Sequence, residues 1–167
     1  MRRASFENMQ CSVAQALEVV GDWWSLLIVR DAFFGVSRFE DFQRRLGIAR
    51  NTLTDRLAWL CDHDVLSRTP YQEAPVRYDY RLTPKGRDLQ LVLTAMMQWG
   101  DRWTPPPGGP PLVTTERGTD PVELRLVNTR TGRTVPPDRV RMVPGPGATD
   151  PNTVPPRLAE AATTSGT

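Results

Sequence analysis

The chain has 167 residues, of which 39% are hydrophobic and 24% charged, and its net charge is +2. A chain of this length can close a hydrophobic core without metal or disulfide help. Its most apolar stretch, residues 23–34, is interrupted by Ser25, Arg30 and Asp31 and falls short of the ~18 uninterrupted apolar residues of a membrane span. No apolar run follows the N-terminal arginines as it would in a signal peptide, so we expect a cytoplasmic protein with no membrane partner.

The sequence carries none of the motifs on which common enzymes and metal sites depend. It has no glycine-rich phosphate loop, no paired metal-ligand motif and no nucleophile elbow. His63 is the only histidine, so acid–base catalysis by histidine has one candidate and no visible partner for it. The only cysteines, Cys11 and Cys61, are expected to stay reduced. We expect no catalytic residue, no cofactor and no metal site.

The spacing of apolar residues predicts four helices in the first part of the chain. Asp22 is placed to cap the second helix, and Ser37 with Glu40 has the pattern of a capping box for the third. Gly21 and Gly47 are placed to end the first and third helices. The expected helices cover residues 11–20, 23–34, 39–46 and 50–63.

The fourth of these helices is expected to have two unlike faces. Leu53, Leu57 and Leu60 recur at intervals of four and three residues, which places them on one side of a helix. The opposite side and its flanks carry short or polar residues. We expect the leucines to pack inward and the polar face to point outward.

Alternating aromatic, branched and charged residues then predict a two-stranded antiparallel ribbon with strands near 65–69 and 77–82. Thr83 and Pro84 form a helix start, and the helix is expected to run to Trp103. Helices with a tight connection between the third and fourth, followed by a ribbon, are typical of a winged helix-turn-helix. The expected fold class is therefore mainly α with a small β wing, in a domain that covers residues 1–103.

Proline divides the chain into two parts, because 13 of its 16 prolines follow Trp103. The Pro/Gly run at 104–111 predicts a linker. Residues 112–143 predict a small C-terminal β-hairpin appendage, and this segment has no Cys or His ligand for a metal. The composition of residues 144–167 predicts disorder. The expected strands of the appendage lie near 122–127, 133–135 and 140–143.

Five strings, in this order and at these spacings, carry a specific resemblance to a known family. The chain resembles the HxlR family of bacterial winged-helix transcription regulators from about Cys11 to Trp103. Any one of the strings would be weak, whereas all of them together are specific. They are Cys11–Ala14, Gly21–Arg30, Ser37–Gln43, Leu53–Leu57 and Tyr78–Gly86.

The resemblance implies a homodimeric, sequence-specific regulator that binds a pseudo-palindromic operator in double-stranded DNA, with repression as the expected outcome. In the family the fourth helix enters the major groove, the wing touches the neighbouring backbone or minor groove, and the terminal helices form the dimer interface. Carried over to this chain, the wing contact is Arg77 and the groove-facing residues are Arg50, Asn51, Thr52, Thr54, Asp55 and Arg56. The expected dimer interface includes Leu89, Val92, Leu93, Met96 and Trp99.

The residues themselves also favour contact with DNA, because arginine side chains suit phosphates and guanine edges. Arg38 is a further candidate contact, and the other arginines of the motif are Arg44, Arg45, Arg50 and Arg56. The chain departs from the family pattern at Ala49, where a serine or threonine cap is frequent, and at Arg50, where proline is frequent. The missing cap costs the helix about 1 kcal/mol, while Arg50 adds a phosphate-binding charge.

Acidic residues near the recognition helix keep an alternative open. Asp55 could accept a hydrogen bond from the amino group of cytosine or orient Arg56 or another arginine, and we favour the orienting role. The near-zero net charge and the nearby Asp62 and Asp64 are also compatible with a winged-helix protein–protein interaction module that does not bind DNA.

Cys11 lies just ahead of the first expected helix. In the resembling family a cysteine at this position serves some members as a sensor of oxidants, quinones or other electrophiles, and a helix N-terminus is a physical reason for a lowered thiol pKa. The alternative is a small residue buried at the dimer seam. An electrophile or another small molecule is therefore the expected inducer.

Overall fold

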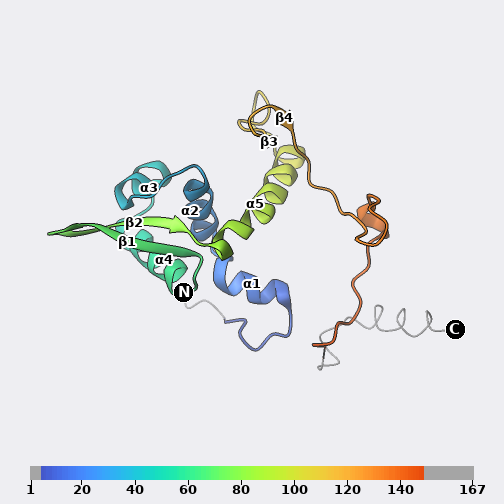
Figure 1. Cartoon of the computed structure of the whole chain (residues 1–167), viewed down its shortest axis with the longest axis horizontal. Coiled ribbons are helices and arrows are strands. Elements are labelled where there is room, and N and C mark those ends of the chain that lie inside the picture. The colour runs from blue at the N-terminus through green and yellow to red at the C-terminus, as the bar shows by residue number, and fades with distance from the viewer. Residues whose placement is uncertain (1–4, 149–167) are drawn as a thin grey trace. The chain divides into compact units, whose positions relative to one another are not determined.

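The computed structural model describes residues 5–148. Residues 149–167, the greater part of the expected disordered tail, lie outside the described residues. Five helices and a two-stranded wing come first, and short C-terminal elements follow (Figure 1). The elements are α1 (Ser12–Val20), α2 (Trp23–Phe33), α3 (Phe39–Leu46), α4 (Arg50–Asp62), β1 (Leu66–Glu73), β2 (Val76–Leu82), α5 (Pro84–Trp103), β3 (Thr115–Glu116), β4 (Asp120–Pro121) and the 3₁₀ helix η1 (Pro137–Arg139).

The chain divides into two compact units. One unit is Val19–Leu124, which contains α2 to β4, and the other combines residues up to Glu18 with residues from Arg125 onward. Among residues 5–148 no single helix is long and apolar enough to cross a membrane, and only the bent pair α1 and α2 reaches that length and composition together.

Side-chain caps start two of the helices as the sequence predicts. Asp22 Oδ1 accepts from the backbone N–H groups of Trp24 and Ser25 at 3.0 and 3.3 Å, and Thr83 Oγ1 accepts from Gly86 N at 3.0 Å. Gly86 lies against the Val65 carbonyl so closely that a Cβ at this position would be 2.1 Å from the carbonyl oxygen. This contact requires glycine and holds the start of α5 against the start of the wing.

The expected capping box at α3 is wrong. The N-cap of α3 is Arg38, with no side-chain cap hydrogen bond, and Ser37 Oγ donates instead to Asp79 Oδ1 of β2 at 3.0 Å. The backbone adds a bond from Tyr80 N to Ser37 O at 2.7 Å. The start of α3 is therefore fixed to the wing rather than to its own first turn, because a carboxylate from a distant strand is the better partner for the Ser37 hydroxyl.

The core lies where α2, α3, α4 and the base of the wing meet. Phe42 and Ile28 are fully buried there, and the α4 leucines point into the same cluster as predicted. Figure 1 shows the wing projecting from these helices and α5 extending beyond them toward β3 and β4. The buried cluster is Val20, Ile28, Val29, Phe42, Ile48, Leu53, Leu57, Leu60, Val65, Leu66 and Tyr80.

The C-terminal segment is less regular than the sequence predicts. A single bridge, Val127 to Thr134, closes the turn at 128–132, and the expected strand at 140–143 is coil that follows η1. Pro136 and Pro137 supply no N–H donors for a ladder, and Val140 and Met142 remain exposed. A third strand therefore has neither the hydrogen bonds nor the covered face it needs.

Candidate nucleic-acid interface

The recognition helix α4 presents the predicted polar residues on its outer side. Arg50, Asn51, Thr54 and Asp55 are exposed, and Thr52 and Arg56 are half-buried at its flanks. The leucines on the inner side anchor the helix, since Leu53, Leu57 and Leu60 are at most 1% exposed. The rotation of α4 about its axis is therefore fixed by the core.

A short turn sets the position of α4 relative to α3. Gly47 ends α3 with a positive φ of 63°, a conformation that favours glycine, and Ile48 is buried in the core. Ala49 is the N-cap of α4 and makes no side-chain cap hydrogen bond, as its residue type predicts. The first turn of α4 thus keeps backbone N–H groups available for a partner.

The side chains at the start of α4 are partly held within the protein. The Arg50 guanidinium lies 4.9 Å from the centroid of the Phe39 ring of α3, an arrangement that stabilises a cation. Thr54 Oγ1 donates to Arg50 O at 3.0 Å, so its proton is used inside the helix. Within the described residues, neither Asp55 nor Arg56 forms an ion pair, and the favoured role of Asp55 in orienting Arg56 finds no contact here.

The wing carries a second basic surface next to α3. Arg38 lies over the Tyr71 ring at 4.6 Å, and its Nε is 3.8 Å from Asp79 Oδ1. Arg77 Nη1 is 3.7 Å from Glu40 Oε1. Because both ion pairs are long and partly exposed, they hold these arginines only weakly.

Sequence reasoning missed the aromatic partners of the wing arginines. Tyr71 carries Arg38 on its face, and Tyr78 lies under Arg68 at 5.1 Å. The alternation of arginine and tyrosine along β1 and β2 was the available signal. These stacks place the guanidinium groups of Arg38, at the start of α3, and of Arg68, on β1, over tyrosine rings of the wing.

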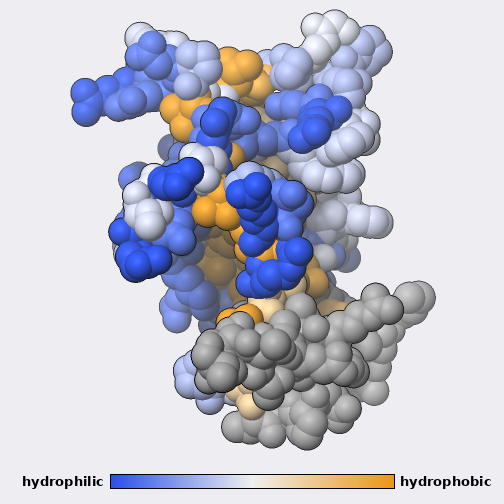
Figure 2. Space-filling model, turned by 90° about the vertical axis from the view of Figure 1, so that its right-hand side faces the viewer, coloured by the Kyte–Doolittle hydropathy of each residue, from blue (hydrophilic) through white to orange (hydrophobic). Residues whose placement is uncertain are grey.

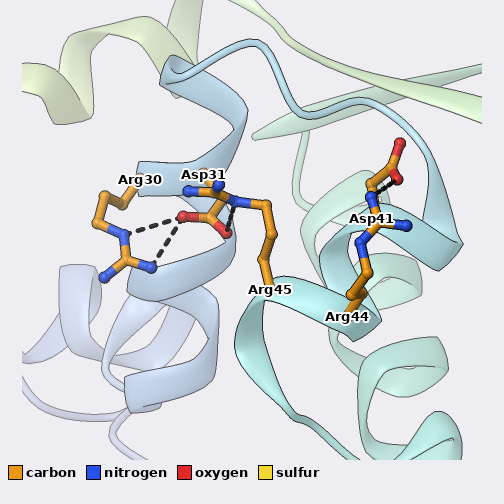
Figure 3. Close-up of polar contacts among 5 residues, drawn as sticks. All are labelled: Arg30, Asp31, Asp41, Arg44 and Arg45. Carbon is orange, nitrogen blue, oxygen red and sulfur yellow. Dashed lines mark hydrogen bonds and ion pairs between the residues drawn. The ribbon is translucent and has the colours of Figure 1, made fainter.

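Ion pairs separate the arginines of the motif into two groups. Arg44 pairs with Asp41 inside α3, and Arg45 Nε is 3.0 Å from Oδ2 of the fully buried Asp31 of α2 (Figure 3). The hydrogen bond to Asp31 and its charge raise the pKa of Arg45. Arg50 and Arg56, both on α4, are left without an acidic partner among residues 5–148.

The two cysteines lie in different environments. Cys11 is exposed and Cys61 is half-buried, and both are free thiols. Burial raises the pKa of the Cys61 thiol, with a smaller opposing effect from the charge of Arg68. Among residues 5–148 no group of acidic, His and Cys side chains could hold a metal ion.

The expected dimer residues of α5 differ in how far they are buried in the single chain. Leu89 and Leu93 pack against the core, whereas Val92, Met96 and Trp99 are exposed, with Trp103 following on the same side. We call Val92, Met96, Trp99 and Trp103 the α5 stripe. Figure 2 shows hydrophobic residues at the surface among hydrophilic ones. The helical period places all of these residues on one broad face of α5, with Leu89 and Leu93 toward its inner edge.

Comparison with known proteins places the chain among transcription regulators. The profile of the HxlR-like helix-turn-helix family matches residues 19–107. The HTH-type transcriptional regulator Rv3095 of Mycobacterium tuberculosis is 46% identical over 140 residues, covering 81% of this chain and 87% of the relative. The structure of PA1607, a candidate transcription factor, is similar with a TM-score of 0.73 and 39% identity over 83% of this chain and 98% of that one. The redox regulator HypR is similar with a TM-score of 0.51 and 30% identity over 55% of this chain and 96% of that one.

The first two similarities extend past the proline-rich linker. Only 111 residues precede Leu112, and the covered shares of this chain, 81% and 83%, exceed that length. Part of the appendage is therefore common to this chain and these relatives. The family and these proteins are regulators and not enzymes.

Proposed function

Because the chain belongs to the HxlR-like helix-turn-helix family and is a transcriptional regulator of the HTH type, we propose that it binds a specific double-stranded DNA operator as a homodimer. The operator is pseudo-palindromic, and binding represses transcription in the bacterial cytoplasm by blocking polymerase. Cys11 makes the repressor responsive to an electrophile or oxidant.

The exposed face of α4 is the observation that carries this proposal. It combines Arg50 and Arg56, two arginines with no acidic partner within residues 5–148, with the short polar residues Asn51, Thr52 and Thr54. Arginine reads guanine edges and asparagine reads adenine in the major groove, and short neighbours let the helix backbone approach the bases. Asp55 has no ion pair in the described part of the chain and is available to accept a hydrogen bond from the cytosine amino group.

The wing and the start of α3 add the contacts that position the protein. The side chains of Arg77 and Arg38 are 47% and 57% exposed, and they lie 3.7 and 3.8 Å from their carboxylate partners. A phosphate can replace such a weakly held carboxylate, and phosphate contacts fix the register of a protein on DNA.

The α5 stripe supports the homodimer. Two copies related by a two-fold axis would bring two α4 helices to half-sites about 34 Å apart, or a multiple of that distance. The redox regulator HypR, similar to this chain, supports the role proposed for the exposed Cys11.

One observation favours the alternative, a protein–protein interaction module. Within the described chain, Arg38, Arg44, Arg45 and Arg77 all have acidic partners, so much of the positive charge near the motif is balanced. A module of this kind would bind its partner protein without DNA.

Selection from a random double-stranded DNA pool by the full chain tests the two functions. We expect one enriched pseudo-palindromic sequence that is also protected near the chain's own gene. Arg56→Ala and Arg77→Ala should each weaken operator binding. Loss of a base contact should cost about 1–3 kcal/mol, and loss of a phosphate contact should lower the salt dependence of binding by about one. Arg130→Ala, at an exposed arginine of the turn at 128–132, is the matched control and should bind like the parent.

A different outcome would reject the proposed function. A pool without any enriched sequence, together with retention on DNA resin that does not respond to salt, would reject DNA binding and support the interaction module.

A further inference from the structure

A cavity of about 540 Å³ opens beside the C-terminal half of α2. It lies wholly within the unit Val19–Leu124, and its volume is in the range of small-molecule pockets. Three segments form its walls: α2, one side of α5 and the segment that follows the proline-rich linker. The lining residues are Arg30, Phe33, Phe34, Gln90, Leu93, Thr94, Met96, Met97, Leu112, Val113 and Thr114.

The outer wall, Leu112–Thr114, is held in place by hydrogen bonds. Thr114 O accepts from Val122 N at 2.8 Å. Gln98 of α5 then binds both sides of the returning segment, with Nε2 donating to Val122 O at 3.4 Å and Oε1 accepting from Leu124 N at 3.2 Å. The start of the appendage therefore closes over α5 as part of a built pocket.

The lining is mainly apolar. Phe33, Leu93 and Met97 are among its apolar residues, and Arg30 is the one ionisable side chain among the lining residues. Thr94 already donates its hydroxyl proton to Gln90 O at 2.8 Å. The chemistry of this pocket thus matches a hydrophobic molecule with a single negative group.

The ion pairs of Arg30 leave positive charge for such a group. Its Nε and Nη2 donate to Asp31 Oδ1 at 3.0 and 2.8 Å, and Arg45 Nε donates to Asp31 Oδ2 at 3.0 Å (Figure 3). Two guanidinium groups share one carboxylate, so the cluster keeps one uncompensated positive charge. The Arg30 side chain is 41% exposed, and its Nη1 makes no hydrogen bond within the part of the chain that the structure describes.

We infer that this cavity binds a small aromatic or alkyl carboxylate, with the apolar body against Phe33, Leu93 and Met97 and the carboxylate on Arg30. The ligand carboxylate competes with Asp31 for Arg30. Since Asp31 also holds Arg45 on α3, the first helix of the helix-turn-helix, ligand binding is coupled to the position of that helix. This second, regulatory step rests on the proposed function.

Binding is tested first on the full chain without DNA, by calorimetry with benzoate, 2-naphthoate and 4-phenylbenzoate, each beside its uncharged amide. We expect saturable binding of one carboxylate per chain, with the amide at least tenfold weaker. Arg30→Gln should weaken binding at least tenfold. Thr94→Trp, which fills the cavity without touching the ion pairs, should abolish it, and Arg102→Gln should leave it unchanged. Unfolding midpoints of all variants verify that they fold.

Three results would overturn the site: no saturable binding of any of the three acids, equal affinity for acid and amide, or an Arg30→Gln variant that binds like the parent. The regulatory step is tested with the operator found by selection. In the parent protein, 2-naphthoate should change the affinity for this operator at least threefold. Arg45→Gln should bind 2-naphthoate but lose this effect, and an unchanged effect would overturn the coupling. A chain that binds no DNA would refute the proposed function, while the binding measurements without DNA would still decide the site.

Discussion

The arginines of the motif differ mainly in what already binds them. Asp31 holds Arg45 and Asp41 holds Arg44, whereas Arg50 and Arg56 have no acidic partner in the described residues. Arg50 follows the uncapped Ala49, and its guanidinium lies 4.9 Å from the centroid of the Phe39 ring. The proposed contact with DNA therefore rests on single residues and not on the overall charge.

The two cysteines allow a matched test of thiol sensing. We expect diamide or benzoquinone to lower operator affinity at least fivefold in the parent and in Cys61→Ser, but not in Cys11→Ser. The physical reason is that the thiolate is the reactive species: Cys11 is exposed, while burial raises the pKa of Cys61. Anisotropy with labelled operator measures the effect. Equal loss of DNA by Cys11→Ser and the parent would rule Cys11 out as the sensor.

Between elements, the joint of α2 and α3 depends on one buried carboxylate. Asp31 is fully buried and binds an arginine from each helix, Arg30 and Arg45. A buried charge is tolerated only when it is paired and hydrogen-bonded, and both oxygens of Asp31 meet this condition. The joint therefore orients α3, and with it the turn that leads into α4.

Removing this charge should weaken the fold measurably. We expect Asp31→Asn to lower the free energy of unfolding by about 2 kcal/mol, less than a fully enclosed pair would lose, because both arginines are partly exposed and can turn to water. Asp41→Asn, which alters a more exposed pair within α3, should cost at most about 0.5 kcal/mol. Urea unfolding measures both, and equal losses would contradict the special role of the joint.

Elements were predictable from sequence where their signals are local. The period of the α4 leucines, the caps at Asp22 and Thr83 and the two strands of the wing all appear in the structure. The caps depend on residues within three positions of each other, so their partners are visible in the sequence.

What the sequence did not reveal depends on distant partners. The Ser37 hydroxyl binds Asp79, 42 residues away, and Asp31 binds Arg45, 14 residues away. The cavity needs Leu112–Thr114 to fold over α5, and no local sequence pattern around these residues predicts that contact. The candidate site on α4 was therefore predictable as a face, while its link to the rest of the molecule was not.

For the whole molecule, the net charge of +2 gives little long-range attraction to DNA. One α4 and one wing present few unpaired arginines, so a single copy would bind weakly. Linking two copies makes the second half-site contact intramolecular and raises the affinity without new contacts. The low charge is therefore a further reason to propose a homodimer on the operator.

The α5 stripe predicts how that dimer can be broken. Trp99 is 63% exposed in the single chain, and buried tryptophans commonly anchor interfaces. We expect Trp99→Asp to raise the dimer dissociation constant by about 30-fold or more, which corresponds to at least ~2 kcal/mol, and to weaken operator binding with it. Val76→Asp, at an exposed apolar residue of the wing, is the control and should leave the dimer intact. Sedimentation velocity over a range of concentrations measures the constant; a Trp99→Asp protein as dimeric as the parent would remove α5 from the interface.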